Sequence, residues 1–299
     1  MKNKFIFGLT LIIISLLIIA IFQRQYRDTA RLEEQTVSVW KEYESLQLMA
    51  EMENNIAREN DHDSSLTSTE DLPDYTQLFP NLYTEKNLTY TTDENKKIAY
   101  LSFDDGPSKN TAKVLEVLKD KDVKATFFIV GSAITEEGEG YLKQMVEEGH
   151  TIGIHTYSHL CNEIYCSIER YLDDFNMVYQ QIYDITGMKV NIYRFPWGSS
   201  NGYSKGIKDS LTEEMDRRGF SYYDWTASAD DSIGKPSAYS IRHNIEKDLD
   251  RDDHPIILMH DSVINGLTAK TLPDIIDMIR EKGYSFDTLD HREPYHFPW

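Results

Sequence analysis

Cysteine is scarce in this sequence, with two residues among 299. Two thiols cannot build a disulfide-rich scaffold or a four-cysteine zinc site. Positive charge is also in short supply, because 31 Lys and Arg stand against 50 Asp and Glu and leave a net charge of −19. We therefore do not expect a nucleic-acid-binding protein or one that binds anionic membrane surfaces, since little would neutralise phosphate groups.

The composition is otherwise that of a globular chain, with 40% hydrophobic and 27% charged residues. The amino-terminal stretch Phe5–Phe22 stands apart, because it contains 18 residues and no charge. As a helix it would extend roughly 27 Å, which suffices to cross a thin hydrocarbon core. The alternative is a cleaved signal peptide, but the stretch ends without a small-x-small cleavage site. We predict a single-pass cell-membrane anchor with the acidic remainder of the chain outside the cell.

The region after this anchor is polar and lacks turn residues at first. Residues 28–58 contain no Gly or Pro, and apolar residues recur every seven positions at Leu32, Val39 and Leu46. This pattern fits a helical stalk, either as a single solvated helix or as a coiled coil that would dimerise the chain. Residues 60–74 hold five acidic residues and no Lys or Arg, as in a flexible linker. The predicted organisation is an anchor over 1–27, a stalk and linker over 28–95, and a folded domain over 96–299.

Beyond Lys96, short apolar runs alternate with segments of helical periodicity. Such alternation predicts parallel strands joined by crossover helices, hence an α/β fold. Seven runs in about 200 residues favour a (β/α)7 barrel, in which chemistry resides at the carboxyl ends of the strands. The seven runs are Ile98–Phe103, Val123–Val130, Thr151–Ile154, Val190–Tyr193, Phe220–Trp225, Pro255–Met259 and Tyr284–Phe286.

Polar side chains follow several of these runs. Asp104 and Asp105 end the first run, where neighbouring side chains point in different directions and could serve different roles, although Asp-Gly-Pro also suits a plain turn. His155 and His159 follow the third run and would share one face if that segment were helical. Two imidazoles and a carboxylate form a set that can hold a catalytic metal with open positions, although an isolated His pair is weak evidence.

Two further strand ends carry single charged or titratable groups. Arg194 follows the fourth run within Arg-Phe-Pro-Trp-Gly, and an arginine there can hold a carboxylate in two hydrogen bonds. His260 ends the sixth run, where an imidazole can act as a general acid. Each of these residues alone would be an ordinary polar strand end.

Taken together, the segments resemble the polysaccharide deacetylases, carbohydrate esterase family four with its NodB homology domain. The resemblance covers roughly Lys96 to Leu289, about two thirds of the chain. It implies a distorted barrel fold. The segments that carry it are Ser-Phe-Asp-Asp-Gly-Pro at 102–107, His-Thr-Tyr-Ser-His at 155–159, Arg-Phe-Pro-Trp-Gly at 194–198 and Leu-Met-His at 258–260.

The resemblance implies a metal-dependent amide hydrolase. Asp105, His155 and His159 would bind a divalent metal, usually zinc in this family, which would lower the pKa of its water and polarise the acetyl carbonyl. Asp104 would be the base that takes the proton of the water. Arg194 would hold that base in position.

The leaving amine and the substrate would be served by the remaining motifs. His260 would protonate the amine, because an amine is a poor leaving group without an acid. The backbone N–H of Trp197 would stabilise the oxyanion together with the metal. Pro196, Trp225 and Leu258 would line the site around the substrate.

The chain departs from the family pattern in its fourth motif. That motif has a first Trp, an Asp and a final Asp-Trp pair, whereas this chain reads Trp225-Thr-Ala-Ser-Ala-Asp-Asp-Ser. We align Asp231 with the final Asp, so Ser232 replaces the last Trp and alters the acetyl pocket. Asp231 would orient His260, with Asp230 as the competing candidate.

The expected function is N-deacetylation of an extracellular polysaccharide, most simply peptidoglycan, because the stalk would hold the domain near the wall. Alternatives are de-O-acetylation of xylan, deacetylation of chitin or an exopolysaccharide, and a non-catalytic wall-binding scaffold. Cys161 and Cys166 follow the second motif and could form a local disulfide beside the metal ligands or, less simply, act as soft ligands.

Overall fold

The computed structural model describes residues 73–86, 90, 93 and 95–298. The expected anchor, the stalk and most of the linker lie outside these residues, so the anchor, the dimerising stalk and the domain boundaries stay predictions. In the described part of the chain, no helix is both long and apolar enough to span a membrane.

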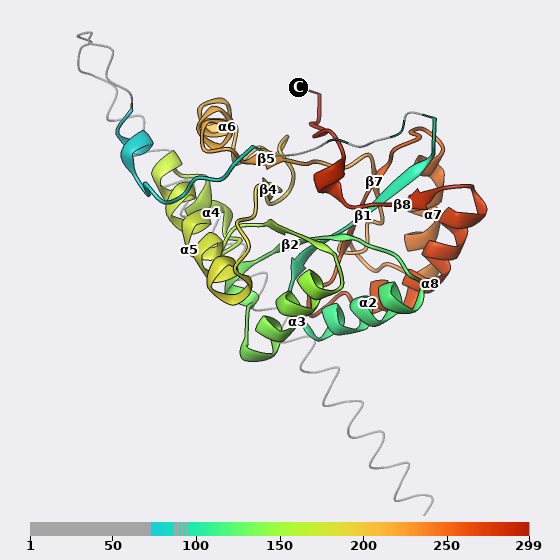
Figure 1. Cartoon of the computed structure of the whole chain (residues 1–299). Coiled ribbons are helices and arrows are strands. Elements are labelled where there is room, and N and C mark those ends of the chain that lie inside the picture. The colour runs from blue at the N-terminus through green and yellow to red at the C-terminus, as the bar shows by residue number, and fades with distance from the viewer. Residues whose placement is uncertain (1–72, 87–89, 91–92, 94, 299) are drawn as a thin grey trace, which may run out of the picture. The chain divides into compact units, whose positions relative to one another are not determined.

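The described strands form one sheet in which every pairing is parallel. Its order is β5-β4-β3-β2-β1-β7-β6, and β8 pairs with the beginning of β1 (Figure 1). Strand β1, which pairs with β2, β7 and β8, is the longest described strand and is buried along nearly all of its length, as is typical of parallel strands covered on both faces. The strands are β1 Ile98–Gly106, β2 Thr126–Ile129, β3 Thr151–Ile154, β4 Ile192–Tyr193, β5 Ser221–Tyr222, β6 Ala227–Ser228, β7 Ile256–His260 and β8 Ser285–Phe286.

The structure confirms the parallel α/β class but corrects the seven-stranded barrel. Each of the seven predicted runs contains a strand, and the additional strand β6 makes eight. Among the described strands, β5 and β6 end the path without pairing to each other, so the sheet is an open half-barrel. The sequence did not reveal β6 because two residues, Ala227 and Ser228, are too short for a period of two to be recognised.

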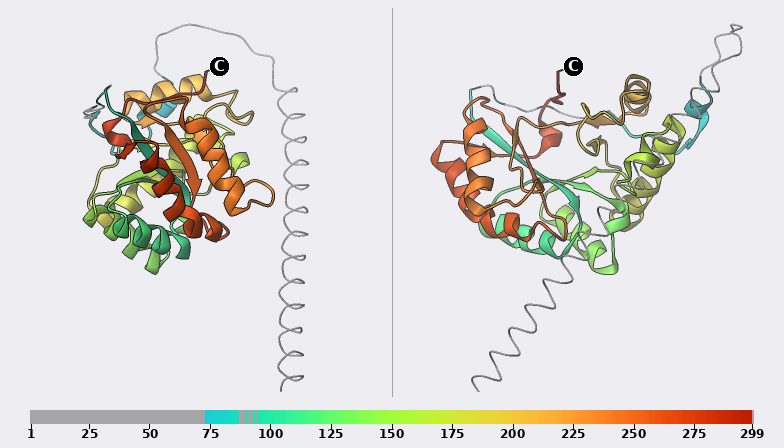
Figure 2. Two further views of the ribbon diagram at one scale, coloured as in Figure 1. Left: turned by 90° about the vertical axis from the view of Figure 1, so that its right-hand side faces the viewer. Right: turned by 180° about the vertical axis from the view of Figure 1, so that it is seen from behind.

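Helices form an arc around the strands (Figures 1 and 2). The longest helix in the described part of the chain, α5, begins after the cap Ser167 and is capped at its C-terminal end by Gly187, whose φ of 72° is the left-handed conformation that glycine favours. The helices are α2 Lys109–Asp120, α3 Glu136–Glu147, α4 Cys161–Ile164, α5 Ile168–Thr186, α6 Lys208–Arg217, α7 Ala238–Leu249 and α8 Gly266–Glu281, with short 3-10 turns η1 Asp74–Gln77, η2 Gly131–Ala133 and η3 Leu289–His291.

The alternating direction of side chains along β1 decides which face of the sheet its two carboxylates lie on. Leu101 and Phe103 join the large apolar core shared with the helices, whereas Tyr100 belongs to the smaller apolar cluster on the opposite, inner face. Asp104 has the same parity as Tyr100 and therefore ends the inner face. At Asp105 the register with β2 shifts and φ is 71°, so this bulge turns the next carboxylate away from the outer core.

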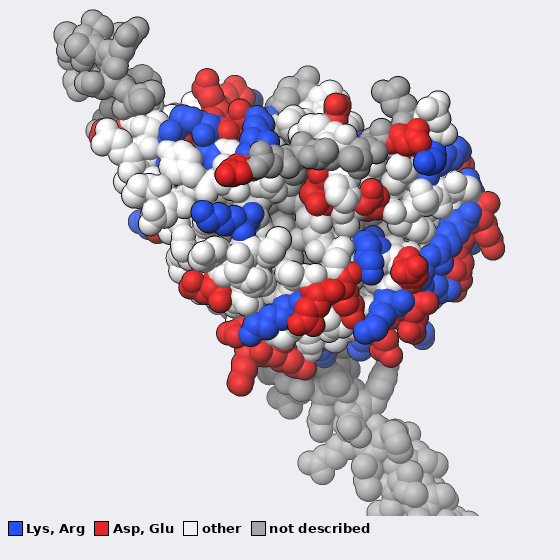
Figure 3. Space-filling view, viewed as in Figure 1, with Lys and Arg blue, Asp and Glu red and all other residues white. Residues whose placement is uncertain are grey.

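Surface charges contribute little to this architecture. Figure 3 shows Lys and Arg interleaved with Asp and Glu along the lower rim of this face. Pairs such as Lys119–Glu148 at 2.9 Å and Lys121–Asp277 at 2.7 Å lie at the surface. Exposed pairs are typically worth about 0–1 kcal/mol, so the stability of the domain rests on its buried side chains.

The substitution Phe175→Ala tests this conclusion. Phe175 is fully buried in α5, and its ring packs edge-on against those of Tyr193 at 5.6 Å and Phe220 at 5.0 Å. We expect the variant to lose about 3–5 kcal/mol of unfolding free energy in urea, because a cavity replaces the ring. Met177→Ala is the control on the same helix, since that side chain is 44% exposed. Equal losses in the two variants would contradict the assignment of the core.

Candidate active site

Three potential metal ligands meet at the carboxyl ends of β1 and β3. Asp105 Oδ1 lies 3.5 Å from His155 Nε2 and 3.4 Å from His159 Nε2. The three ligand atoms are all within 4.8 Å of one another. The structure thus brings together the three residues that are predicted from the sequence to be metal ligands.

The chemistry of these atoms fits a divalent cation. Asp105 Oδ1 is buried and receives no hydrogen bond from the described residues. His155 Nδ1 donates to the carbonyl of Arg194 at 2.9 Å, because a carbonyl can only accept, so Nε2 presents its lone pair toward Asp105. Burial, together with neighbouring His159, lowers the pKa of His155 to about 3 and keeps the imidazole neutral, the form that binds metals. A carboxylate oxygen facing two imidazole nitrogens is a donor set that suits a divalent cation.

The loop carrying the two imidazoles is not helical, which corrects the shared helical face assumed for His155 and His159. Residues 155–160 form an irregular turn, and both Thr156 and His159 have left-handed backbones, with φ of 67° and 55°. The buried carboxylate of Asp174 on α5 accepts hydrogen bonds from the backbone N–H groups of Tyr157 and, at 3.0 Å, Ser158. Asp174 therefore holds the turn in the conformation that makes the two imidazoles converge.

Asp104 lies beside this group and is paired with Arg194. The guanidinium Nη1 donates to Asp104 Oδ1 at 2.8 Å and to Ser102 Oγ at 2.8 Å. Arg194 is fully buried, and its guanidinium also stacks over the ring of Phe128 at 4.3 Å. Burial raises the pKa of Asp104 above its ordinary value, although the charge of Arg194 lowers it. The second oxygen, Oδ2, is 3.7 Å from His155 Nε2 and faces the candidate metal ligands.

His260 stands directly across from Asp104, because the two are register partners on β7 and β1. Its Nδ1 lies 2.7 Å from Asp231 Oδ1, and its backbone N–H donates to Asp231 Oδ2 at 2.9 Å. Burial opposes protonation, but the hydrogen bond and charge of Asp231 raise the pKa of His260 to about 9. Asp230 instead accepts from Ser228 Oγ at 2.7 Å. The geometry thus favours Asp231 over Asp230 as the partner of His260.

The loop after β4 forms another wall of the site. Trp197 has φ of 63°, and its ring lies against His159 with centroids 4.6 Å apart. The carbonyl of Pro196 accepts from the hydroxyl of Tyr165 at 3.0 Å, which ties the loop to α4. The ring of Trp197 is 47% exposed, so it can meet a ligand as well as His159.

The remaining predicted substrate residues occupy the inner face or its edge. Leu258 lies between Ile256 of the inner cluster and His260 in the alternation of β7. Trp225 packs against that same cluster. Ser232 is exposed, and Asn265 Nδ2 donates to its hydroxyl at 3.1 Å, so no aromatic side chain stands at this position.

Sequence reasoning missed two buried carboxylates that support the site, Asp174 and Asp224. The signal for Asp174 was present, because an acidic residue falls on the apolar stripe of α5 beside Phe175. Asp224 is fully buried and accepts from the backbone N–H of Ser199 at 2.9 Å. Cys161 Sγ donates to Asn162 Oδ1 at 3.4 Å and Cys166 Sγ donates to the carbonyl of Glu163 at 3.1 Å. Hydrogen bonds from the backbone N–H groups of Tyr157 and Ser158 to Asp174 brace the turn after β3.

Comparisons with known proteins agree with this arrangement. The family model described as polysaccharide deacetylase matches residues 91–215. A peptidoglycan-N-acetylglucosamine deacetylase of Bacillus cereus is 34% identical over 210 residues, which cover 69% of this chain and 73% of that protein. The peptidoglycan-N-acetylmuramic acid deacetylase PdaA of Bacillus subtilis is 30% identical over 227 residues, covering 73% and 80%.

A solved structure has the same fold. The catalytic domain of a peptidoglycan N-acetylglucosamine deacetylase from Eubacterium rectale aligns with a TM-score of 0.66 at 33% identity. The alignment covers 70% of this chain and 96% of that domain.

Asp174→Asn tests the support of the metal-ligand turn. An amide cannot accept two backbone N–H groups with both of its heavy atoms, so the turn loses part of its anchor. We expect the affinity for Zn²⁺, measured by isothermal titration calorimetry, to fall about 10–100-fold, the usual cost of losing a residue that orients metal ligands. Asp173→Asn changes the exposed neighbouring carboxylate and serves as the control. Unchanged affinity in Asp174→Asn would show that the turn needs no such anchor.

Proposed function

The chain belongs to the polysaccharide deacetylase family of hydrolases, and from this premise we propose that it removes N-acetyl groups from the amino sugars of peptidoglycan, releasing acetate. The observation that carries this proposal is the buried Oδ1 of Asp105, which accepts no hydrogen bond from the described residues and lies near the Nε2 atoms of both His155 and His159. It lies at one end of a site that also holds a buried base paired with arginine and an imidazole paired with a carboxylate.

Asp104 is the proposed general base. When bound at Asp105, His155 and His159, a divalent cation, which we propose is Zn²⁺, supplies Lewis acidity toward the acetyl carbonyl and lowers the pKa of a water molecule. Asp104 takes the proton of the attacking water at Oδ2, because Oδ1 is held by Arg194. The raised pKa of Asp104 makes it a stronger base than an exposed aspartate.

His260 is the proposed general acid. Its Nδ1 is engaged by Asp231, so Nε2 carries the proton that is delivered to the nitrogen of the sugar as the C–N bond breaks. The register of β1 and β7 pairs Asp104 with His260 on neighbouring strands. The base can therefore take a proton from water, and the acid can give a proton to the nitrogen, at the same amide group. The acetyl carbon leaves as acetate and the sugar nitrogen as a free amine.

The backbone N–H of Trp197 is the proposed donor to the oxyanion, in a loop whose exposed ring and Pro196 border the site. Leu258 and Trp225 offer apolar surface from the inner face for the acetyl methyl group. The family pattern has a tryptophan where this chain has the exposed Ser232, so we propose that the wall of the acetyl pocket is reduced here. The reduced wall bears on which acetylated sugar is accepted.

We further propose that Phe5–Phe22 anchors the chain in the cell membrane with the catalytic domain outside, next to the wall polymer. The support for this is the uncharged length of that segment and the peptidoglycan activity for which two relatives are named. One of these relatives is named for N-acetylglucosamine and the other for N-acetylmuramic acid, so both sugars belong in any substrate panel.

Acetate release by the purified full-length protein tests the proposal. We expect release from peptidoglycan, loss on treatment with a chelator, and recovery on addition of Zn²⁺, with His155→Ala inactive throughout. Chitooligosaccharides and acetylated xylan are assayed beside peptidoglycan. Release from these and none from peptidoglycan would overturn the substrate. No release from any glycan, with no metal bound, would favour a non-catalytic scaffold.

The pH dependence of kcat/KM tests the pairing of His260 with Asp231. The acid must be protonated, and its pKa of about 9 keeps it so through neutral pH. In Asp231→Asn the burial of His260 is no longer opposed by that charge, so the alkaline limb of the profile should move about one pH unit or more toward acid. Asp230→Asn, the adjacent carboxylate bonded to Ser228, should leave the limb in place. A shift in Asp230→Asn alone would reverse the assignment.

A further inference from the structure

The C-terminal segment Pro294–Phe297 runs beside β5, at one open end of the half-barrel (Figure 1). The backbone N–H of Asp224 donates to the carbonyl of Tyr295 at 2.9 Å, and the N–H of Phe297 donates to Asp224 Oδ2 at 2.8 Å. Tyr295 packs against the inner apolar cluster, whereas His296 stacks on Tyr222 with centroids 3.7 Å apart. The segment therefore alternates like an extended strand and flanks the chain as it leaves β5.

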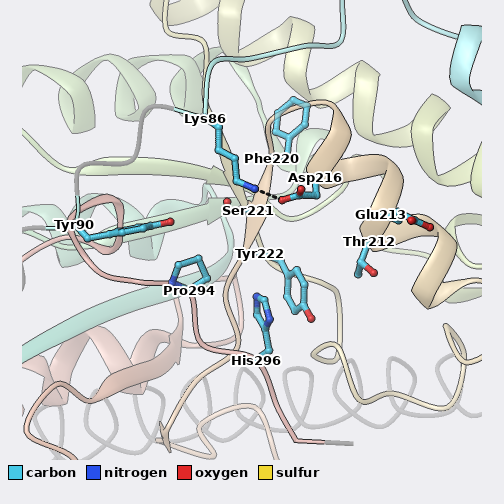
Figure 4. Close-up of a pocket in the computed structure, with 10 residues that line it drawn as sticks. All are labelled: Lys86, Tyr90, Thr212, Glu213, Asp216, Phe220, Ser221, Tyr222, Pro294 and His296. Carbon is cyan, nitrogen blue, oxygen red and sulfur yellow. Dashed lines mark hydrogen bonds and ion pairs between the residues drawn. The ribbon is translucent and has the colours of Figure 1, made fainter.

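The outer side of this segment is open. A cleft of about 520 Å³ is lined by Pro294, His296 and Tyr222, and across it Lys86 pairs with Asp216 (Figure 4). His296 is exposed at the rim of this cleft, so its stacking on Tyr222 is a contact on the outside of the sheet. The inner side chains of the segment, in contrast, pack on the inner face of the sheet, Tyr295 against the inner apolar cluster and Phe297 against Trp225.

Asp224 joins the segment to the loop of Trp197. The carboxylate is fully buried and receives three hydrogen bonds. Ser199 supplies two of them, from its backbone N–H at 2.9 Å to Oδ1 and from its hydroxyl to Oδ2, and the N–H of Phe297 supplies the third. One buried charge thus fastens the end of the loop to the C-terminal segment, and charge-assisted hydrogen bonds of this kind are the stronger ones.

Phe297 also supports the loop by direct packing. Its ring lies edge-on to Trp225, with centroids 4.8 Å apart. A side chain on Gly198 would meet both rings, because its Cβ would lie 2.9 Å from Trp225 and 3.0 Å from Phe297. The backbone of the loop therefore rests on the two rings. Trp197 and Gly198 have consecutive positive φ values of 63° and 79°, and such a conformation persists only where its surroundings impose it.

We propose that Asp224 and Phe297 are positioning residues that hold the backbone N–H of Trp197 toward the reacting carbonyl, with the C-terminal segment as their support. The proposal rests on the proposed function for its chemical consequence. Its structural content, a loop fastened from the C-terminal segment, stands independently of substrate.

Hydrogen exchange of the full-length protein tests the structural content without any substrate. In Phe297→Ala we expect the amides of residues 197–199 to exchange at least about tenfold faster, because local opening becomes easier when their support is removed. The amides of residues 155–159, held by Asp174, should exchange at the wild-type rate. His296→Ala is the matched control, since it removes the neighbouring side chain from the outer side only. Unchanged exchange at 197–199 in Phe297→Ala would overturn the proposal.

Kinetics test the consequence for catalysis. For the glycan that the wild type deacetylates, kcat of Phe297→Ala should fall about tenfold, with KM within about twofold and Zn²⁺ affinity unchanged, because misplacing one oxyanion donor weakens binding of the transition state alone. Phe297→Leu should recover part of that loss. In the double variant Asp224→Asn/Phe297→Ala, the loss of kcat should be smaller than the combined losses of the two single variants, since both residues act on one loop.

A lower melting temperature with wild-type kcat would show a structural role only, and a parallel loss of Zn²⁺ affinity would show that the support acts elsewhere. If the wild type released no acetate from any glycan, the proposed function would fail while hydrogen exchange still decided the support of the loop.

Discussion

The buried ion pair between Arg194 and Asp104 is the interaction on which the rest of the site depends. The guanidinium is fully buried and donates to Asp104, to Ser102 and, through Nε at 2.8 Å, to the carbonyl of Tyr223. The backbone carbonyl of the same residue accepts from His155 Nδ1 and so fixes which imidazole nitrogen faces the candidate metal position. One residue at the end of β4 thereby orients both the proposed base and a candidate metal ligand. Removing it would leave a buried carboxylate uncompensated, which is strongly destabilising.

Around this pair, three buried carboxylates have a common use. Asp174 accepts backbone N–H groups of the turn after β3, Asp224 accepts one from the loop after β4, and Asp231 accepts the N–H of His260 at the end of β7. Each comes from a different segment than the loop it holds. Hydrogen bonds to a carboxylate are stronger than those to a neutral acceptor. Buried carboxylates from other segments therefore fix the backbone of the two loops and of the strand end that carry the candidate site.

Sequence alone predicted the parallel α/β fold, seven of the eight described strands and the three candidate metal ligands that the structure brings together. This succeeded where the chemistry is local, as in Asp104–Asp105 at the end of a long apolar strand. It failed where partners are distant or very short. The two-residue β6 leaves no periodic signal, and the open edge between β5 and β6 depends on pairings that no single run encodes. Asp224 could be seen only as a neighbour of Trp225, because its donors lie 25 and 73 positions along the chain.

The central claim is that two adjacent carboxylates divide the work, with Asp105 binding the metal and Asp104 moving the proton. Measuring Zn²⁺ content and acetate release of Asp104→Asn and Asp105→Asn in parallel tests it most directly. We predict that Asp104→Asn retains one equivalent of Zn²⁺ and loses turnover, while Asp105→Asn loses both. An active Asp104→Asn enzyme, or an Asp105→Asn protein that binds Zn²⁺ as tightly as the wild type, would contradict the account.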